Sequence, residues 1–203
     1  AAGQLYAARV KGKGPQRIDI LTGTEGAFNL GQRDKGFSDA LKAAGVNFHI
    51  AATLACDEDT GKAVTQVESA LSGTANLNGL FIDGPWPLLG SESNLSQMVS
   101  RAKSGQLTVV SFDSLQPELK FIQDGSVIGL VGQTYYDWGY QGVDVMRNVL
   151  AEHAKYPAEV DTGLDIVTPN GGPGQISVAQ MNDKWTRSAF TATPIPPQST
   201  GSK

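Results

Sequence analysis

The sequence predicts an α/β fold with a doubly wound, mostly parallel open sheet. Short apolar runs that end in Gly or Asp alternate with segments that have helical apolar spacing. The runs at 77–83 (LNGLFID) and 107–113 (LTVVSFD) are continuously apolar, as in parallel strands covered on both faces. A chain of 203 residues with 40% hydrophobic residues can also bury a core of its own.

The first part of the chain contains two strand–helix units. Residues 17–23 (RIDILTG) form a β-branched run that ends in Gly, and residues 29–45 follow with one apolar helical face. Residues 48–54 form a second apolar strand. After an acidic turn, the apolar spacing over residues 63–71 predicts the second helix.

The same alternation continues through the middle of the chain. The strands at 77–83 and 107–113 flank a predicted helix over 94–104. A short helix over 117–123, stopped by an Asp-Gly pair, leads to a strand at 127–131. Strands that alternate with helices at this spacing indicate a doubly wound open sheet.

The rest of the chain departs from this repeat. Residues 135–155 predict a long helix, and residues 160–168 predict a closing strand. The tail, 170–203, is expected to be largely irregular or disordered, because its last ten residues contain too few apolar groups to offset the ordering cost. Within it, 176–190 is a candidate docking helix with Val178, Met181 and Trp185 inward.

Composition excludes several classes of protein. The net charge of -4 arises from acids and bases that are interspersed, so no basic stripe exists for nucleic acid. No apolar run approaches membrane length, and the N-terminus lacks a secretory signal pattern, which suggests a mature chain, a fragment or a cytoplasmic protein. Cys56 is the single cysteine, and His49 and His153 have no ligand partner nearby, so no metal site or cofactor is expected.

Polar residues end several predicted strands. In an open parallel sheet, ligands bind beyond the carboxyl ends of the strands. Carboxylates accept hydroxyl protons, a carboxamide offers a donor and an acceptor, and an indole stacks on the apolar face of a sugar ring. The set therefore predicts a site for a small sugar or polyol, with these candidates: Glu25, Asp83, Trp86, Asp113 and Gln133.

Other roles for these residues stay open. Asp83, Asp113 and Ser114 also occupy positions where they could cap the next helix. Asp83 and Asp113 could serve as acid and base of a glycosidase, but that chemistry needs a suitable separation and a raised pKa. The turn at 23–26 (GTEG) lacks the Gly-Lys-Ser/Thr of a phosphate loop.

An ordered set of motifs resembles the second half of ribose-type periplasmic binding proteins, members of the type I periplasmic-binding-protein superfamily that share ancestry with lactose-repressor-type effector domains. The motifs span about residues 1–170: 23–26 followed by 29–37 with its R-x-x-G-F, 79–88 (GLFIDGPWPL), 111–113 (SFD), the D-G…Q pattern from 124 to 133, and 161–168. This resemblance implies a flavodoxin-like lobe.

The resemblance also implies roles for individual residues. Asp113 and Gln133 would bond to sugar hydroxyls, and Trp86 would stack on the ligand or wall the pocket. Asn29 and Arg33 are further candidates, although the usual ligand-binding Arg position holds Gly31, so Arg33 also has a structural role open to it. Where ribose binders present Asn-Asp this chain has Gly84-Pro85, so another aldose, a sugar alcohol or another polyol is expected as readily as ribose.

The family has a whole first lobe ahead of the matched segment, which implies a domain division. Residues 1–12 would be a remnant helix of the first lobe, 13–134 the ligand-binding lobe, 135–157 a crossover helix that belongs to or faces the first lobe, 158–169 the closing strand, and 170–203 the tail. The apolar face of the crossover helix would then need a partner, either the first lobe or a second copy of the chain. That face comprises Tyr140, Val143, Met146 and Leu150.

The function implied is a solute-binding protein, or its C-terminal lobe, that binds a sugar for the membrane permease of an ABC importer or for a chemoreceptor. Its location would be periplasmic or secreted, with a lipid anchor as one option. One alternative is the sugar-sensing effector domain of a transcription regulator or receptor, although no basic helix-turn-helix precedes Arg17. A further alternative is a polyol-processing enzyme on the same fold; no catalytic residue is expected in the main reading.

Overall fold

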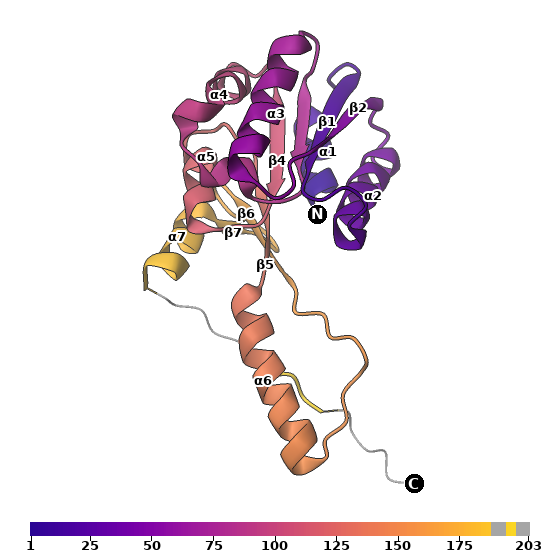
Figure 1. Ribbon diagram of the computed structural model, residues 1–203, viewed down its shortest axis with the longest axis vertical. Helices are drawn as coiled ribbons and strands as arrows, with labels where there is room; N and C mark the ends of the chain where they lie inside the picture. Colours follow the sequence, from indigo (N-terminus) through magenta and orange to yellow (C-terminus); the bar gives the residue numbers. More distant parts are fainter. Residues whose placement is uncertain (188–193, 198–203) are drawn as a thin grey trace.

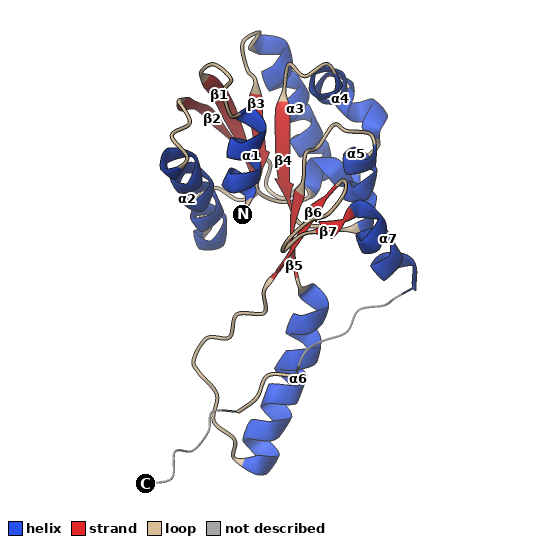
Figure 2. Cartoon of the chain, turned by 180° about the vertical axis from the view of Figure 1, so that it is seen from behind, coloured by secondary structure: helices blue, strands red, loops and turns tan. Residues whose placement is uncertain are grey.

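A single seven-stranded sheet organises the protein, in a computed structural model that describes residues 1–187 and 194–197. The strand order is β2-β1-β3-β4-β5-β6-β7 (Figure 2). The first five strands in this order are parallel, β6 runs antiparallel to β5, and β7 is parallel to β6. Their bounds are β1 Gln16–Thr22, β2 Phe48–Ala55, β3 Gly79–Ile82, β4 Thr108–Phe112, β5 Leu130–Gln133, β6 Leu164–Thr168 and β7 Ile176–Ser177.

Helices cover both faces of this sheet (Figures 1 and 2). One layer contains α1 (Ala2–Val10) and α2 (Phe28–Ala43), and the other contains α3 (Thr60–Gly73), α4 (Ser96–Lys103), α5 (Leu119–Gln123) and α7 (Val178–Arg187). Three 3-10 turns, η1 (Trp86–Leu89), η2 (Glu92–Leu95) and η3 (Gln116–Glu118), complete the connections. The predicted doubly wound, mostly parallel α/β fold is confirmed.

The burial of the central strands on both faces of the sheet explains why their sequences are continuously apolar. In β3, Leu80 and Ile82 join the core under α3 and α4, whereas Phe81 joins the core under α1 and α2. Phe81 stacks on Phe37 of α2 with ring centroids 4.3 Å apart. Because side chains alternate between the faces of a strand, a strand covered on both sides has no polar position to spare.

The N-terminal helix, predicted to be a remnant of the first lobe, packs on this same core. Tyr6 is fully buried and packs edge-on against Phe37, at 5.5 Å between centroids. The Tyr6 hydroxyl donates to Oε1 of Gln16 at the start of β1 over 3.1 Å. Ala2, Ala7 and Val10 are buried on the same helical face. The helix therefore covers the sheet of the lobe that follows it.

The long helix α6 (Tyr135–Glu152) stands apart from the two layers (Figure 1). The chain leaves the sheet at the end of β5 and returns at the start of β6, so α6 projects beyond the carboxyl edge. The four side chains of the predicted apolar face are each between 53% and 72% exposed: Tyr140, Val143, Met146 and Leu150. This helix contributes little to the core that the sheet forms.

Three boundaries differ from the sequence predictions. The strand expected from Val127 begins at Leu130, and the strand expected from Val160 begins at Leu164. The tail expected to be irregular holds β7 and α7, and α7 packs Met181 into the core with Val178 and Trp185 against it. The expected disorder of residues 188–193 and 198–203 lies outside the described residues.

Within the described part of the chain, no helix combines the length and apolarity that a membrane crossing requires. The same residues contain no group of three or more His, Cys, Asp or Glu side chains placed to hold a metal ion.

Candidate functional site

A ring of three hydrogen-bonded side chains lies at the carboxyl edge of the sheet. Asp113 directly follows β4, Gln133 ends β5, and Tyr135 begins α6. The carboxamide Nε2 of Gln133 donates to Oδ1 of Asp113 over 2.7 Å and to the Tyr135 hydroxyl oxygen over 2.8 Å. The Tyr135 hydroxyl in turn donates to the same Oδ1 over 2.5 Å. The predicted pairing of Asp113 and Gln133 at one edge is therefore present, with Tyr135 as a third member.

The ring leaves two acceptors unused. Oδ2 of Asp113 and Oε1 of Gln133 accept no hydrogen bond from any residue that the structure describes. Neither atom belongs to the buried polar atoms without a partner, so both remain accessible. Burial, and next the hydrogen bond to Asp113, raise the pKa of Tyr135, which keeps its hydroxyl protonated as a donor. The edge thus offers two oriented acceptors to a group that carries O–H donors.

Asp113 adopts an unusual backbone conformation. Its φ is +71°, in the left-handed region that non-glycine residues rarely adopt. The residue is nevertheless buried, at 4% exposure. Such strained residues persist where the surroundings fix them, and they cluster at ligand sites.

Arg33 joins the ends of two neighbouring strands. It extends from α2, donates from Nη1 to the backbone oxygen of Asp83 over 2.5 Å, and lies with its Cζ 4.5 Å from the centroid of the Phe112 ring. Its charge also acts on Tyr135, whose pKa it lowers against the larger raising effects. Arg33 therefore braces β3 against β4 and places a positive charge beside the ring of three side chains.

Asp83, another predicted ligand contact, has a buried carboxyl, and its role toward a ligand stays a prediction. The residue is fully buried, and Oδ2 accepts from the Thr22 hydroxyl over 2.7 Å. Burial first, and the nearby carboxyl of Asp34 second, raise the pKa of Asp83 to about 7. Burial likewise raises the pKa of Asp34 to about 6, and a hydrogen bond from Asp83 opposes that rise. Burial therefore favours the protonated form of both carboxyls inside the fold.

Trp86 packs against the larger core cluster at the ends of β1 and β3. A Cβ added to Gly23 would lie 2.7 Å from two carbons of the indole ring, and one added to Gly84 would lie 2.3 Å from one of them. The ring therefore occupies the space that these two glycines leave free. No hydrogen bond joins Trp86 to Asp113 or Gln133 in the described structure, and its predicted contact with a ligand stays a prediction.

The remaining candidates lie at the β1 side of the edge. Glu25 precedes α2 and Asn29 lies in its first turn; both are exposed. Glu25 lines a surface depression together with Thr22, Gly31 and Asp34. Within the described residues, neither Glu25 nor Asn29 bonds to Asp113 or Gln133.

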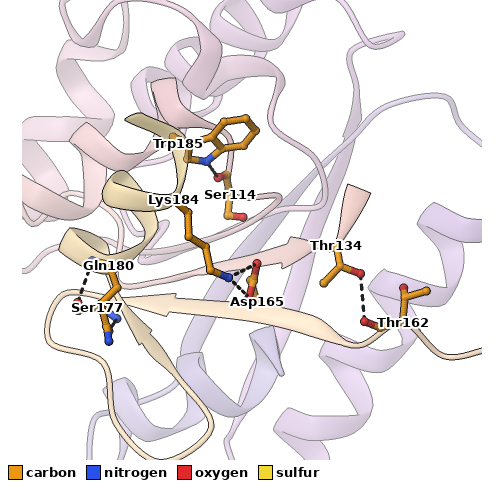
Figure 3. A network of polar contacts seen from close by, with 8 residues as sticks. All are labelled: Ser114, Thr134, Thr162, Asp165, Ser177, Gln180, Lys184 and Trp185. Carbon is orange, nitrogen blue, oxygen red and sulfur yellow. Dashed lines mark hydrogen bonds and ion pairs between the residues drawn. The ribbon is translucent and has the colours of Figure 1, made fainter. Parts of the chain in front are cut away.

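A cavity of about 340 Å³ lies behind the ring, between α6, β6 and α7. Gln133 and Tyr135 line this cavity together with Lys184 and Trp185 of α7. Figure 3 shows Lys184 paired with Asp165 and the Trp185 indole bonded to the backbone of Ser114.

Sequence reasoning did not identify Tyr135, Lys184 or Trp185 as site residues. Tyr135 carried a usable signal, because it follows Gln133 by two residues at the start of a helix and so must lie near the same strand end. Lys184 and Trp185 carried no such signal, because their position depends on how α7 packs against parts of the chain that are far away in sequence.

An open sheet with oriented hydrogen-bonding side chains beyond its strand ends defines a small-molecule-binding α/β lobe. Residues 1–154 match the family described as periplasmic binding protein domain, and the chain belongs to that family.

Named relatives narrow the similarity. The chain is 26% identical over 170 residues to a D-ribose/D-allose-binding protein of Pseudomonas aeruginosa, with 82% of this chain and 51% of that protein covered. Two solved ABC transporter solute-binding proteins are each 28% identical over 82% of this chain. One, from Burkholderia graminis in complex with D-arabinose, has a TM-score of 0.68 with 58% of its chain covered. The other, from Agrobacterium vitis with bound D-fucose, has a TM-score of 0.71 with 57% covered.

The chain spans about half the length of the curated relative that it matches.

Proposed function

We propose that this chain is the sugar-binding lobe of a solute-binding protein and that it holds a monosaccharide or related polyol at the edge formed by Asp113 and Gln133. The observation that best supports this proposal is the ring of hydrogen bonds in which Gln133 and Tyr135 both donate to Oδ1 of Asp113. That arrangement leaves Oδ2 of Asp113 and Oε1 of Gln133 oriented toward incoming hydroxyl protons. A sugar supplies neighbouring ring hydroxyls that can donate to these two oxygens.

The relatives support the ligand class. D-arabinose and D-fucose occupy the solved neighbours at 28% identity, and the curated relative is named for D-ribose and D-allose. These ligands are pentoses and hexoses in which ring hydroxyls are the shared feature. The proposal therefore names an aldose and leaves the orientation of its hydroxyls to experiment.

Binding, not catalysis, suits the carboxylates of this edge. A glycosidase needs two carboxyl groups that both reach the substrate. Asp83 is fully buried and its carboxyl accepts a hydrogen bond from Thr22, so it is poorly placed to reach a ligand. Asp113 is already engaged by two donors, which favours a fixed acceptor over a nucleophile.

The location and partners follow from the family. A periplasmic location, delivery of the sugar to an ABC permease, and a first lobe that closes over the ligand are all part of this proposal. The exposed apolar face of α6 supports such a cover, because Val143, Met146 and Leu150 are each at least 60% exposed.

A thermal-shift panel of pentoses, hexoses and their alditols on this chain tests the proposal. A stabilising ligand raises the melting temperature through its preference for the folded state. We expect one or a few aldoses to do so in a concentration-dependent way, whereas an unresponsive melting temperature across the whole panel would overturn the proposal. One lobe provides only part of the contacts, so high sugar concentrations are required.

A further inference from the structure

The C-terminal helix α7 contacts the backbone that carries Asp113. The indole Nε1 of Trp185 donates to the backbone oxygen of Ser114 over 2.9 Å, across 71 residues of sequence (Figure 3). Ser114 is 3% exposed and follows Asp113 directly. This bond therefore fixes one side of the residue whose φ of +71° needs support from its surroundings.

The same helix contacts the strand that supports Gln133. Lys184 Nζ lies 3.1 Å and 3.3 Å from the two carboxylate oxygens of Asp165 (Figure 3). Asp165 of β6 stands opposite Gly132 in the antiparallel pairing with β5, and Gly132 directly precedes Gln133. The side chains of the ion pair are 34% exposed on Lys184 and 20% exposed on Asp165, which limits screening by water.

The two supported segments also contact each other. A Cβ added to Gly132 would lie 2.0 Å from Oγ of Ser114, so only a glycine lets the end of β4 approach β5 this closely. A shift of either segment would therefore move the other, and with it the 2.7 Å bond between Gln133 and Asp113. The helix holds this unit from both sides.

We infer that Trp185 and Lys184 are positioning residues that set the geometry of the Asp113–Gln133 pair, so that α7 tunes sugar affinity from behind the site. This helix lies beyond residues 1–154, the part of the chain that matches the family. The functional meaning of the inference rests on the proposed sugar site, whereas its structural content does not.

The test reads the pair directly, without a ligand. In ¹⁵N-labelled protein the side-chain amide signals of Gln133, assigned by their loss in Gln133→Leu, report its bonds to Asp113 and Tyr135. We expect Trp185→Phe, which removes the N–H donor and leaves a smaller aromatic ring, to move these signals toward the position of an unbonded carboxamide. Lys184→Met should do the same, and Lys184→Arg should restore the wild-type position because it keeps the charge.

Arg187→Met is the control on the same helix, because Arg187 forms an ion pair with Asp183 within α7 and with no residue of β6 or of the Asp113 segment in the described structure. Unchanged Gln133 signals in both Trp185→Phe and Lys184→Met would overturn the inference. For a sugar that stabilises the wild type, affinity should fall about threefold to tenfold in Trp185→Phe, the effect of one net hydrogen bond. If the signals move but no sugar binds any form, the positioning role stands and the proposed function fails.

Discussion

Gln133 and Asp113, twenty residues apart, are joined by a 2.7 Å hydrogen bond at the point where two adjacent parallel strands end. Each side chain limits the rotamers of the other, and the Tyr135 hydroxyl closes the ring. A site preorganised in this way loses less side-chain entropy when a ligand binds. The predictions below test this ring, the buried groups beneath it and the helix beyond it.

Removing the Tyr135 hydroxyl should weaken sugar binding more than it weakens the fold. In Tyr135→Phe, Oδ1 of Asp113 loses one of its two donors, so we expect affinity to fall about threefold to tenfold. The free energy of unfolding should drop by only about 1 kcal/mol. Tyr140→Phe is the control, because it removes a hydroxyl from the same helix at a residue that is 53% exposed. Calorimetric titration of the sugar into both variants measures the affinities. Equal affinities for the two variants would remove Tyr135 from the site.

The pKa of Asp83, which burial raises to about 7, predicts a pH dependence of stability. A folded-state pKa raised from 3.8 to about 7 means that folded Asp83 holds a proton which unfolded Asp83 releases. Stability from this group is therefore complete below pH 3.8 and is lost as the pH rises through about 7. Across that window the wild type should lose about 2 to 4 kcal/mol relative to Asp83→Asn.

Urea unfolding of the two proteins at several pH values within that window provides the measurement, and exposed Glu159→Gln provides the control. Subtracting the Asp83→Asn curve removes the opposite contribution of carboxyls such as Asp124, whose pKa is lowered. Parallel curves for the wild type and Asp83→Asn would show that Asp83 is ionised in the fold.

The packing of Trp86 predicts opposite effects for two Gly→Ala substitutions. At Gly84 a methyl group would meet the indole ring at 2.3 Å, so Gly84→Ala should cost about 1 to 3 kcal/mol of stability and change the tryptophan fluorescence. At Gly31, inside α2, no atom lies within 4 Å of the added carbon, and Gly31→Ala should stabilise by about 0.5 to 1 kcal/mol. If Gly84→Ala leaves the free energy of unfolding unchanged, the indole ring of Trp86 does not occupy the space beside Gly84.

The three methionines test whether α6 stands outside the core. Met98 and Met181 are 0% and 2% exposed, whereas Met146 on α6 is 60% exposed. Truncation to Ala should cost about 2 to 5 kcal/mol at Met98 and Met181. At Met146 the change should stay within about 0.5 kcal/mol in denaturant unfolding. A large loss at Met146 would mean that the α6 face is already covered in this chain.

The sequence predicted the sheet well because each strand carries its own evidence. The runs 77–83 and 107–113 are apolar on both faces of their strands, as Leu80 and Phe81 show by entering different cores, and a local pattern reveals that directly. Tyr6 was harder, because its partner Phe37 belongs to another helix and periodicity does not name the layer that a helix covers.

The site was predictable only as far as topology reaches. Asp113 and Gln133 both end parallel strands, so their meeting follows from the fold. Asp83 also ends a strand, yet its side chain turns inward to Thr22, a choice decided by rotamer and by the neighbouring Asp34. Trp185 bonds to Ser114, 71 residues earlier in the chain, because α7 packs against that part of the fold, and no local sequence pattern predicts this packing.

The most direct test of the central claim is a calorimetric titration of the most stabilising aldose into the wild type, Gln133→Leu and Gln106→Leu. Gln106 is an exposed glutamine that precedes β4, at the amino end of the strand whose carboxyl end carries Asp113. The account predicts that Gln133→Leu weakens binding about tenfold to a hundredfold, the cost of lost hydrogen bonds and an unpaired Asp113 carboxylate, with Gln106→Leu matching the wild type. Equal affinities in all three proteins would contradict a sugar site at the Asp113–Gln133 edge.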